Sequence, residues 1–382
     1  MTSPYAQRTS DLRHALAAVD VDVAILTHPD AIAYFAGYWN YLGMEFGRPT
    51  ILIVAIGFPP TLITPLMEVE MCASMTWIGD IRPWSDGGEE WRRPLRDLIE
   101  GWRSSRVGVD AKFIPNVVSH ELGSLVCEGQ IQDIGPVVAA LRRIKSPEEI
   151  TIMRQAGQVA IAMMDGARGA IGEGVPEYEI ALTAMAAGTR KAAEFLAASS
   201  DRFVSPLIHD LQILQSGRDT CMVHRRASTR RLERGDPVYL CFCGMVRFRN
   251  YKLGFDRQFF VGEATDEQLR VQRAAVAAQE AALAAIRPGV TCEAVNEAAE
   301  HAYAREGFQP GYRTGRAVGL SLLEAPELKR GEGTRIEPGM TFAVDGGITL
   351  PRTGGGRVGD SIVVTDDGFE WLTPYPRDDA IV

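Results

Sequence analysis

The sequence of 382 residues lacks several patterns that would each define a class of protein. No apolar run approaches the roughly 18 residues that a membrane-spanning helix requires. The first residues, MTSPYAQRTSDLRHAL, contain no basic region followed by an apolar one, so they do not resemble a secretory signal. Six cysteines are scattered, and none forms a Cys-x-x-Cys pair. Structural zinc and a disulfide framework are therefore not expected.

A surplus of positive charge is missing as well. The formal net charge is −9 at pH 7, whereas binding to nucleic acid normally needs a basic face. The hydrophobic fraction of 46% supports packed cores, and the length is sufficient for two domains. We expect a soluble cytoplasmic protein without a nucleic-acid or membrane partner and without a cofactor.

The first 143 residues show an α/β pattern, which predicts an N-terminal domain of that class. Helical spacing over 8–18 predicts a helix that is capped by Thr9 or Ser10. The aromatic, glycine-broken stretch DAIAYFAGYWNYLGMEFGRP predicts a loop, and another helix is expected near 117–127. Short apolar runs rich in β-branched residues predict strands at 21–27, 50–57 and 105–111.

The sequence changes character at Ser146-Pro147, a cap and first residue for a long amphipathic helix. We therefore expect a second domain over 144–382. Within it, IGEGVPEYEI (171–180) and IRPGVTCEAV (286–295) share an isoleucine and a Gly-Val pair at a constant offset of 115 positions. A duplication would pack two equivalent helix pairs on one sheet. Two unrelated helix–turn–helix joints would give the same pattern by chance.

Four further apolar runs in the second part predict antiparallel strands joined by long insertions. These runs are 237–246, 255–262, 340–348 and 360–365. The glycine run TGGG at 353–356 is not followed by Gly-Lys-Ser/Thr, which favours a flexible turn over an anion-binding loop.

Three side chains are candidates for chemistry. No two of the six histidines have the close spacing of metal-binding helices. His224, however, follows a Ser-Gly turn and precedes an expected strand, where an imidazole can exchange protons near neutrality. Asp256 (GFDRQFF) and Asp345 (TFAVDGG) lie in otherwise apolar strands, and a buried acid needs a partner. The ordinary alternatives are a solvated histidine and acids on the solvent face of alternating strands.

Four blocks follow one another in an order that resembles the creatinase/aminopeptidase P/methionine aminopeptidase (M24) superfamily. They are RRIKSPEEITIMRQA, QSGRDTCMVH with RLERGDPVYL, TGRAVGLSLLEAP, and IEPGMTFAVDGG with GGRVGDSIVVTDDG. The resemblance implies an α+β two-domain chain. An N-terminal creatinase/prolidase-type α/β domain would cover 1–143, and a pseudo-symmetric pita-bread catalytic domain would cover 144–382.

Metal-dependent members of this superfamily hold two ions with two aspartates, a histidine and two glutamates. Carried onto this sequence, four of these positions fall on Cys243, Gly254, Arg316 and Gly359, and Asp345 alone keeps a carboxylate. A fixed positive charge at Arg316 opposes hard dications. The resemblance therefore implies the creatinase-like branch, which works without metal.

In that branch the resemblance assigns proton transfer to His224 and the holding of a cationic group to Asp256 and Asp345. Creatinase has glutamates at both acid positions, and each aspartate is one methylene shorter. We therefore expect a substrate other than creatine itself, such as a small zwitterion with a larger cationic or cyclic amidine group. Ectoine hydrolases, which are similar to creatinase, accept such compounds.

The resemblance also implies a carboxylate clamp and a homodimer. Creatinase offers a Phe-Gly-Arg element of its N-terminal domain to the active site of the neighbouring subunit. Phe46-Gly47-Arg48 matches that element, and Arg48 would bind a substrate carboxylate with two hydrogen bonds. Arg316 is a second candidate for the carboxylate, and Lys329 stands near a further substrate-binding arginine of creatinase.

The expected activity is hydrolysis of a C–N bond in a small amidine, guanidine or amide zwitterion related to creatine or ectoine. Cys241 and Cys243 leave open a covalent variant in which a thiolate attacks the amidine carbon. Two other functions also remain open, a metal-dependent Xaa-Pro peptidase and a pita-bread protein that binds without catalysis.

Overall fold

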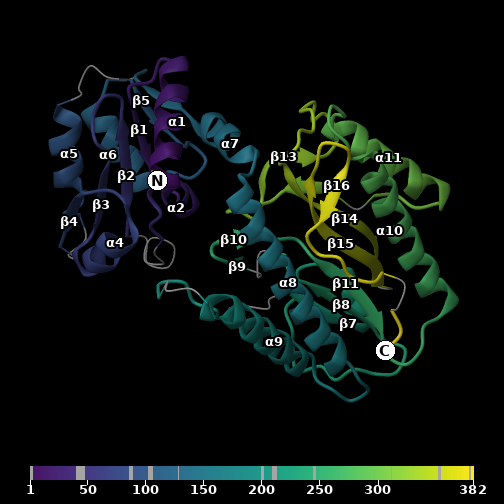
Figure 1. Cartoon of the computed structure of the whole chain (residues 1–382). Helices are drawn as coiled ribbons and strands as arrows, with labels where there is room; N and C mark the ends of the chain where they lie inside the picture. Colours follow the sequence, from purple (N-terminus) through teal and green to yellow (C-terminus); the bar gives the residue numbers. More distant parts are fainter. Residues whose placement is uncertain are drawn as a thin grey trace. The chain divides into compact units, whose positions relative to one another are not determined.

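The computed structural model describes residues 3–39, 48–85, 89–101, 106–127, 129–198, 202–208, 213–243, 247–310, 312–351, 354–377 and 380–382. The chain divides into two compact units, Met1–Arg142 and Arg143–Val382. Each unit contains its own sheet with helices packed on it (Figure 1). None of the described helices is long and apolar enough to cross a membrane.

The first unit is built on a mixed sheet of six strands within the described residues, in the order β4-β3-β2-β1-β5-β6. β1 pairs antiparallel with β2 and parallel with β5, and its four residues are all buried. The elements are α1 (Pro4–Ala18), β1 (Val23–Leu26), α2 (Pro29–Ala36), β2 (Ile51–Ala55), β3 (Thr61–Pro65), η1 (Leu66–Glu68), α4 (Val69–Met75), β4 (Asp80–Trp84), α5 (Arg92–Glu100), β5 (Val107–Val109), α6 (Asn116–Leu125), β6 (Ile131–Asp133) and α7 (Gly135–Arg143).

Two sequence predictions for this unit were wrong. The aromatic stretch after the first strand begins with the helix α2 rather than a loop, and Gly37 ends that helix in the left-handed conformation with φ 73°. The rest of the stretch, 40–47, lies outside the described residues. The helix α1 starts at Pro4, before the caps expected at Thr9 or Ser10. Proline at a first helical position is favourable because its missing N–H has no partner there in any case.

The second unit is built on a sheet whose strands pair antiparallel, as predicted. The strand order is β13-β12-β14-β15-β11-β8-β7, and β16 pairs with β15. Its elements are α8 (Pro147–Ala170), α9 (Glu177–Ala197), β7 (Ile213–Ser216), η2 (Gly217–Cys221), β8 (Pro237–Cys241), β9 (Arg247–Phe248), β10 (Tyr251–Lys252), β11 (Asp256–Phe260), α10 (Asp266–Ala285), α11 (Cys292–Arg305), β12 (Gly315–Ala317), β13 (Glu324–Leu328), β14 (Thr341–Leu350), β15 (Gly354–Val364) and β16 (Phe369–Trp371).

The repeat in the sequence corresponds to a repeat in the structure. The pairs α8/α9 and α10/α11 are each joined by a turn with a left-handed glycine, Gly174 and Gly289. Gly174 donates its N–H to the Leu232 carbonyl, and Gly289 donates in the same way to Ile336, both at 2.8 Å. The two halves therefore share their helix pairs and the backbone bonds at the corner between the helices.

The prediction of a turn at the TGGG run was wrong. Gly354, Gly355 and Gly356 are the first residues of β15 and pair with the end of β14. A Cβ added to Gly356 would lie 2.7 Å from the Val271 carbonyl of α10, and one on Gly355 would lie 2.3 Å from the Ile348 carbonyl. Glycine is needed at these two positions because backbone carbonyls of α10 and β14 lie too close to leave room for a side chain.

Alternation along β14 separates the two faces of the sheet. Val344 belongs to the core formed with α10 and α11, which lie along this face in Figure 1. Asp345, the next residue, therefore points to the opposite face. On that face Asp345 and Asp256 both pair in register with Gly359, because β14 and β11 flank β15. The fold thus brings the two acids to one place.

Packing of α8 gives a test of the fold. A Cβ at Gly157 would lie 1.8 Å from the Leu372 carbonyl, whereas one at Gly169 of the same helix would meet nothing within 4 Å. We expect Gly157→Ala to lower the free energy of unfolding by roughly 1–3 kcal/mol or more, because the backbone at Leu372 must move to make room for the methyl group. Gly169→Ala should raise it by up to about 1 kcal/mol. Urea unfolding of both variants measures the difference, and equal stabilities would contradict the packing.

Candidate functional site

Two buried acids lie beside a glycine. Asp256 is 3% exposed and Asp345 is 5% exposed. A Cβ on Gly359 would lie 2.8 Å from Asp345 Oδ1 and 3.1 Å from Asp256 Oδ2. The carboxylates therefore converge over Gly359, and any larger residue there would push them apart. The expectation that these acids share one site matches this geometry.

A buried guanidinium completes the acidic pair. Arg316 of β12 donates from Nη1 to Asp345 Oδ2 at 2.7 Å and from Nε to the Leu322 carbonyl at 3.2 Å. Burial acts to lower the pKa of Arg316, but Cys243, Asp345 and Asp256 outweigh it and raise the pKa well above its usual value. Arg316 therefore stays charged, and its charge is committed to the protein's own acids.

Asp256 has two donors of its own. The hydroxyl of Tyr239 donates to Oδ2 at 3.0 Å, and the thiol of Cys243 donates to Oδ1 at 3.3 Å. Burial and the nearby Asp256 raise the pKa of Tyr239 well above its usual value, so the phenol keeps its proton. Tyr239 was missed in the sequence, although alternation in PVYLC places it on the same face as Cys241.

Asp345 differs from Asp256 in having an oxygen without a donor. Oδ1 is buried and has no hydrogen-bond partner among the described residues. Burial raises the pKa of Asp345 to about 6, against the lowering effect of Arg316 and with a further rise from Asp256. A buried acceptor without a donor is costly, so this oxygen is suited to receive an N–H or O–H from a bound molecule.

His224 lies in the turn after η2 and is exposed. Its imidazole makes no hydrogen bond or ion pair within the described part of the chain, so the structure does not place it in contact with either acid. The segment that carries it is nevertheless fixed to the sheet. Gln215 of β7 donates to the Arg225 carbonyl at 2.6 Å and stands opposite Tyr239 in the strand register.

The other predicted substrate contacts are distributed differently. Phe46 lies outside the described residues. Arg48 is half-buried in the first unit, whereas the acids belong to the second. Lys329 donates to Glu327 at 2.6 Å, with about half of its side chain exposed. Among the predicted residues, the structure joins Asp256, Asp345, Arg316 and Cys243 into one described cluster.

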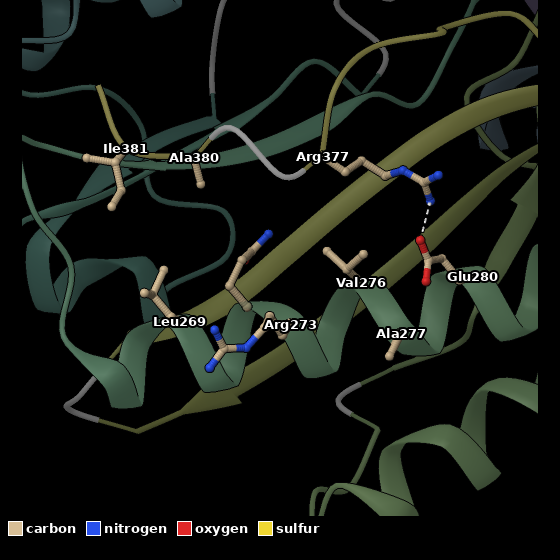
Figure 2. A pocket seen from close by; sticks show the side chains of 9 residues that line it. Leu269, Arg273, Val276, Ala277, Glu280, Arg377, Ala380 and Ile381 are labelled. Atoms are coloured by element: carbon tan, nitrogen blue, oxygen red, sulfur yellow. Dashed lines mark ion pairs between the residues drawn. The ribbon is translucent and has the colours of Figure 1, made fainter.

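A cavity of about 490 Å³ lies away from this cluster, between α10 and the C-terminal residues. Figure 2 shows Leu269, Val276 and Arg273 on its helix side and Arg377 opposite, paired with Glu280 at 3.6 Å. α10 covers the face of the sheet opposite to the acids, so this cavity does not open onto them.

Comparisons with known proteins agree with the fold. Residues 151–366 match the model of metallopeptidase family M24, and residues 8–144 match the creatinase/prolidase N-terminal domain. The chain belongs to the M24 family. Its pita-bread architecture is shared with the crystal structure of a prolidase from Thermococcus sibiricus, with a TM-score of 0.86 over 100% of both chains at 21% identity.

Relatives of this M24 protein carry several names. An agropine synthesis cyclase of Rhizobium rhizogenes is 28% identical over 97% of this chain and 96% of its own length. A Xaa-Pro dipeptidase of Pyrococcus furiosus is 28% identical over 94% of this chain and 95% of its own. A creatinase of Bacillus sp. (strain B-0618) is 26% identical over 97% of this chain and 90% of its own.

Because the family is one of metallopeptidases, we compared the residues at the five expected metal-ligand positions with what a metal ion needs. A Cβ at Gly254 would lie 3.0 Å from Arg316 Nη2 and 3.6 Å from Cys243 Sγ, while Gly359 adjoins Asp345. The five positions named from the sequence therefore surround one point. Two are glycines and one is a guanidinium, which leaves a carboxylate and a thiol. This set does not fit two hard dications.

A different donor set lies at the edge of the same place. Cys241, Cys243 and Asp256 form the one described group of three possible metal ligands, with ligand atoms within 4.8 Å of one another. Burial raises the pKa of Cys241 well above its usual value, and Cys243 already donates to Asp256. The positive charge of Arg316 lies beside this group and repels a dication, so this donor set is also a poor fit for a metal ion.

The raised pKa of Asp345 predicts a pH dependence of stability. The carboxyl titrates at about 6 in the folded protein and near 4 in an unfolded chain. Between these values the folded state binds more protons, so the free energy of unfolding falls as pH rises and levels off above about 6. Asp345→Asn should remove this contribution, which amounts to at most about 1.4 kcal/mol per pH unit.

Urea unfolding from pH 4 to 8 measures the effect as the difference between the wild type and Asp345→Asn. The exposed Asp97 of α5 provides a matched control, because Asp97→Asn removes the same charge from the surface. An identical pH dependence in the wild type and Asp345→Asn would contradict a raised pKa at this position.

Proposed function

We propose that the protein is a metal-independent hydrolase that acts on a C–N bond in a small amidine, guanidine or amide zwitterion related to creatine or ectoine. The observation that carries the proposal is the pairing of Arg316 with Asp345 at the point where metal ligands of the family would converge. The similarity to a creatinase over 97% of the chain supports it. The name of the cyclase relative shows that the family includes reactions other than peptide hydrolysis.

The charges of the cluster favour a singly charged substrate group. Asp256 and Asp345 carry two negative charges when ionised, and Arg316 offsets one of them. A cationic amidine or guanidine group neutralises the remainder and finds an acceptor in Asp345 Oδ1. Its positive charge makes the carbon electrophilic, so attack by water needs no metal ion.

His224 carries the proton in this mechanism. It takes a proton from the attacking water and returns one to the leaving nitrogen as the C–N bond breaks. A positioned acid–base residue contributes about 10²–10⁴-fold, so orientation of the substrate supplies much of the remaining acceleration. In the proposed homodimer the Phe46-Gly47-Arg48 element of each subunit serves the partner's site, where Arg48 binds the substrate carboxylate and Phe46 contributes to substrate binding. Arg316 was the second candidate for this carboxylate, but its charge is paired with Asp345, so the carboxylate falls to Arg48. The proposed location of the activity is the cytoplasm.

A metal-dependent Xaa-Pro peptidase is the second candidate. The Xaa-Pro dipeptidases among the relatives favour it, with identities up to 28%. The residues at the ligand positions oppose it. A third possibility, a pita-bread protein that binds without catalysis, does not explain why His224 and both acids are present.

Metal independence and the role of His224 are tested by one screen. Ammonia or urea release from creatine, guanidino acids, ectoine and hydantoin-type compounds should persist in EDTA. His224→Ala should lower kcat by about 10²-fold or more. His301→Ala, an exposed histidine of α11, serves as the control. Turnover of Xaa-Pro dipeptides alone, restored by added metal after EDTA, would establish the second candidate instead.

A second experiment decides between water and a thiolate as the nucleophile. Cys243 lies in the cluster, where it donates to Asp256 beside Arg316, so its sulfur is the candidate for thiolate attack. With water as the nucleophile, Cys243→Ala should leave kcat largely unchanged. Cys292→Ala controls for the loss of a buried thiol elsewhere. Complete loss of turnover in Cys243→Ala alone, with a covalent adduct in the mass spectrum of the wild type, would identify thiolate attack.

A further inference from the structure

A buried glutamate holds the segment that carries His224. Glu177, the first residue of α9, is fully buried. Its carboxylate accepts from Ser216 Oγ at 2.6 Å, from Ser228 N at 2.8 Å and from Ser228 Oγ at 2.6 Å. These two serines stand at the two ends of the segment 216–228, so one carboxylate joins its beginning to its end.

The same carboxylate binds the residue next to the histidine. Arg225 donates from Nη1 to Glu177 Oε2 at 3.0 Å and from Nη2 to Oε1. The backbone of Arg225 is fixed from the other side, because its carbonyl accepts from Gln215 at 2.6 Å. Both the side chain and the backbone at the position after His224 are therefore held, while the imidazole itself stays exposed.

Burial of Glu177 is compensated by these donors. Burial alone would raise the pKa of Glu177, but the bonds from Arg225, Ser216 and Ser228 outweigh it and lower the pKa. The carboxylate is therefore ionised when it binds Arg225. A buried charge pair of this kind is a poor source of net stability, which suggests that it serves to fix a geometry.

The second half of the pseudo-symmetric unit shows that the corner does not need the acid. Cys292, the first residue of α11, occupies the place of Glu177. Cys292 N donates to the Thr334 carbonyl at 2.9 Å, as Glu177 N does to Arg230. The backbone bonds of the corner are thus the same in both halves. The carboxylate is present only where the neighbouring segment carries His224.

We propose that Glu177 is a positioning residue for His224, acting through Arg225 and the two serines. A catalytic effect of Glu177 rests on the proposed function. The position that Glu177 gives to the His224 imidazole can be tested without any substrate.

The experiment follows the histidine ring signals of the whole chain by NMR. His224→Ala identifies the signal of His224 among the six. In Glu177→Gln that signal should shift or broaden, because the amide cannot pair with Arg225 as a carboxylate does. Arg225→Gln should move the same signal, and the double variant should add little to either single change. Glu179→Gln, in the same turn of α9 but exposed, should leave all six signals in place.

Kinetics then separate positioning from simple stability. For a compound that the screen identifies as a substrate, Glu177→Gln should lower kcat by up to about 10²-fold with little change in KM. A lowered melting temperature with the His224 signal and kcat unchanged would overturn the proposal and leave Glu177 a structural residue. If His224→Ala retained turnover, the proposed function would fail, yet a shifted His224 signal in Glu177→Gln would still establish the positional link.

Discussion

The cluster depends on close approach of side chains over two glycines. Asp256, Asp345 and Arg316 converge because Gly359 and Gly254 present no side chain toward them. A single Cβ at Gly359 would come within 2.8 Å of a carboxylate oxygen, so even alanine would change the arrangement. Two of the five positions expected to hold metal ligands are thus positions where this chain needs glycine.

The second unit was predictable because its signals are local and repeated. The offset of 115 positions between the two Gly-Val turns marked two equivalent corners, and both Gly174 and Gly289 adopt the left-handed conformation there. The acids were predicted as a pair from the resemblance to creatinase, because an aspartate in an apolar strand shows only that a partner is needed and not which one. Their common neighbour Gly359 was not predictable from the sequence. The strand register that places Gly359 opposite both acids depends on pairing between segments about a hundred residues apart.

Contacts between distant segments explain the failures. The glycines of the TGGG run were taken for a turn because their close neighbour, the Val271 backbone of α10, lies far away in the sequence. Tyr239 was overlooked since an apolar run does not reveal which of its residues meets Asp256. Glu177 and Arg225 are separated by 48 positions, and neither belongs to a pattern that points to His224. The loop interpretation of α2 failed for another reason, since aromatic residues and glycine are weak evidence against a short, buried helix.

The internal guanidinium decides which ligands the cluster can accept. Arg316 cannot lose its proton within any ordinary pH range, so one positive charge is permanent, whereas a metal ion could be exchanged. A dication added to Arg316 would leave a surplus of positive charge against two carboxylates. A singly charged organic cation leaves none and can donate to Asp345 Oδ1, the carboxylate oxygen of the cluster that has no donor among the described residues. Because Asp345 has a pKa of about 6, this match holds above that pH and is lost once the carboxyl takes up a proton. The cluster therefore suits a monovalent cationic group near neutral pH, which is the charge of the amidine or guanidine group in the proposed zwitterionic substrate.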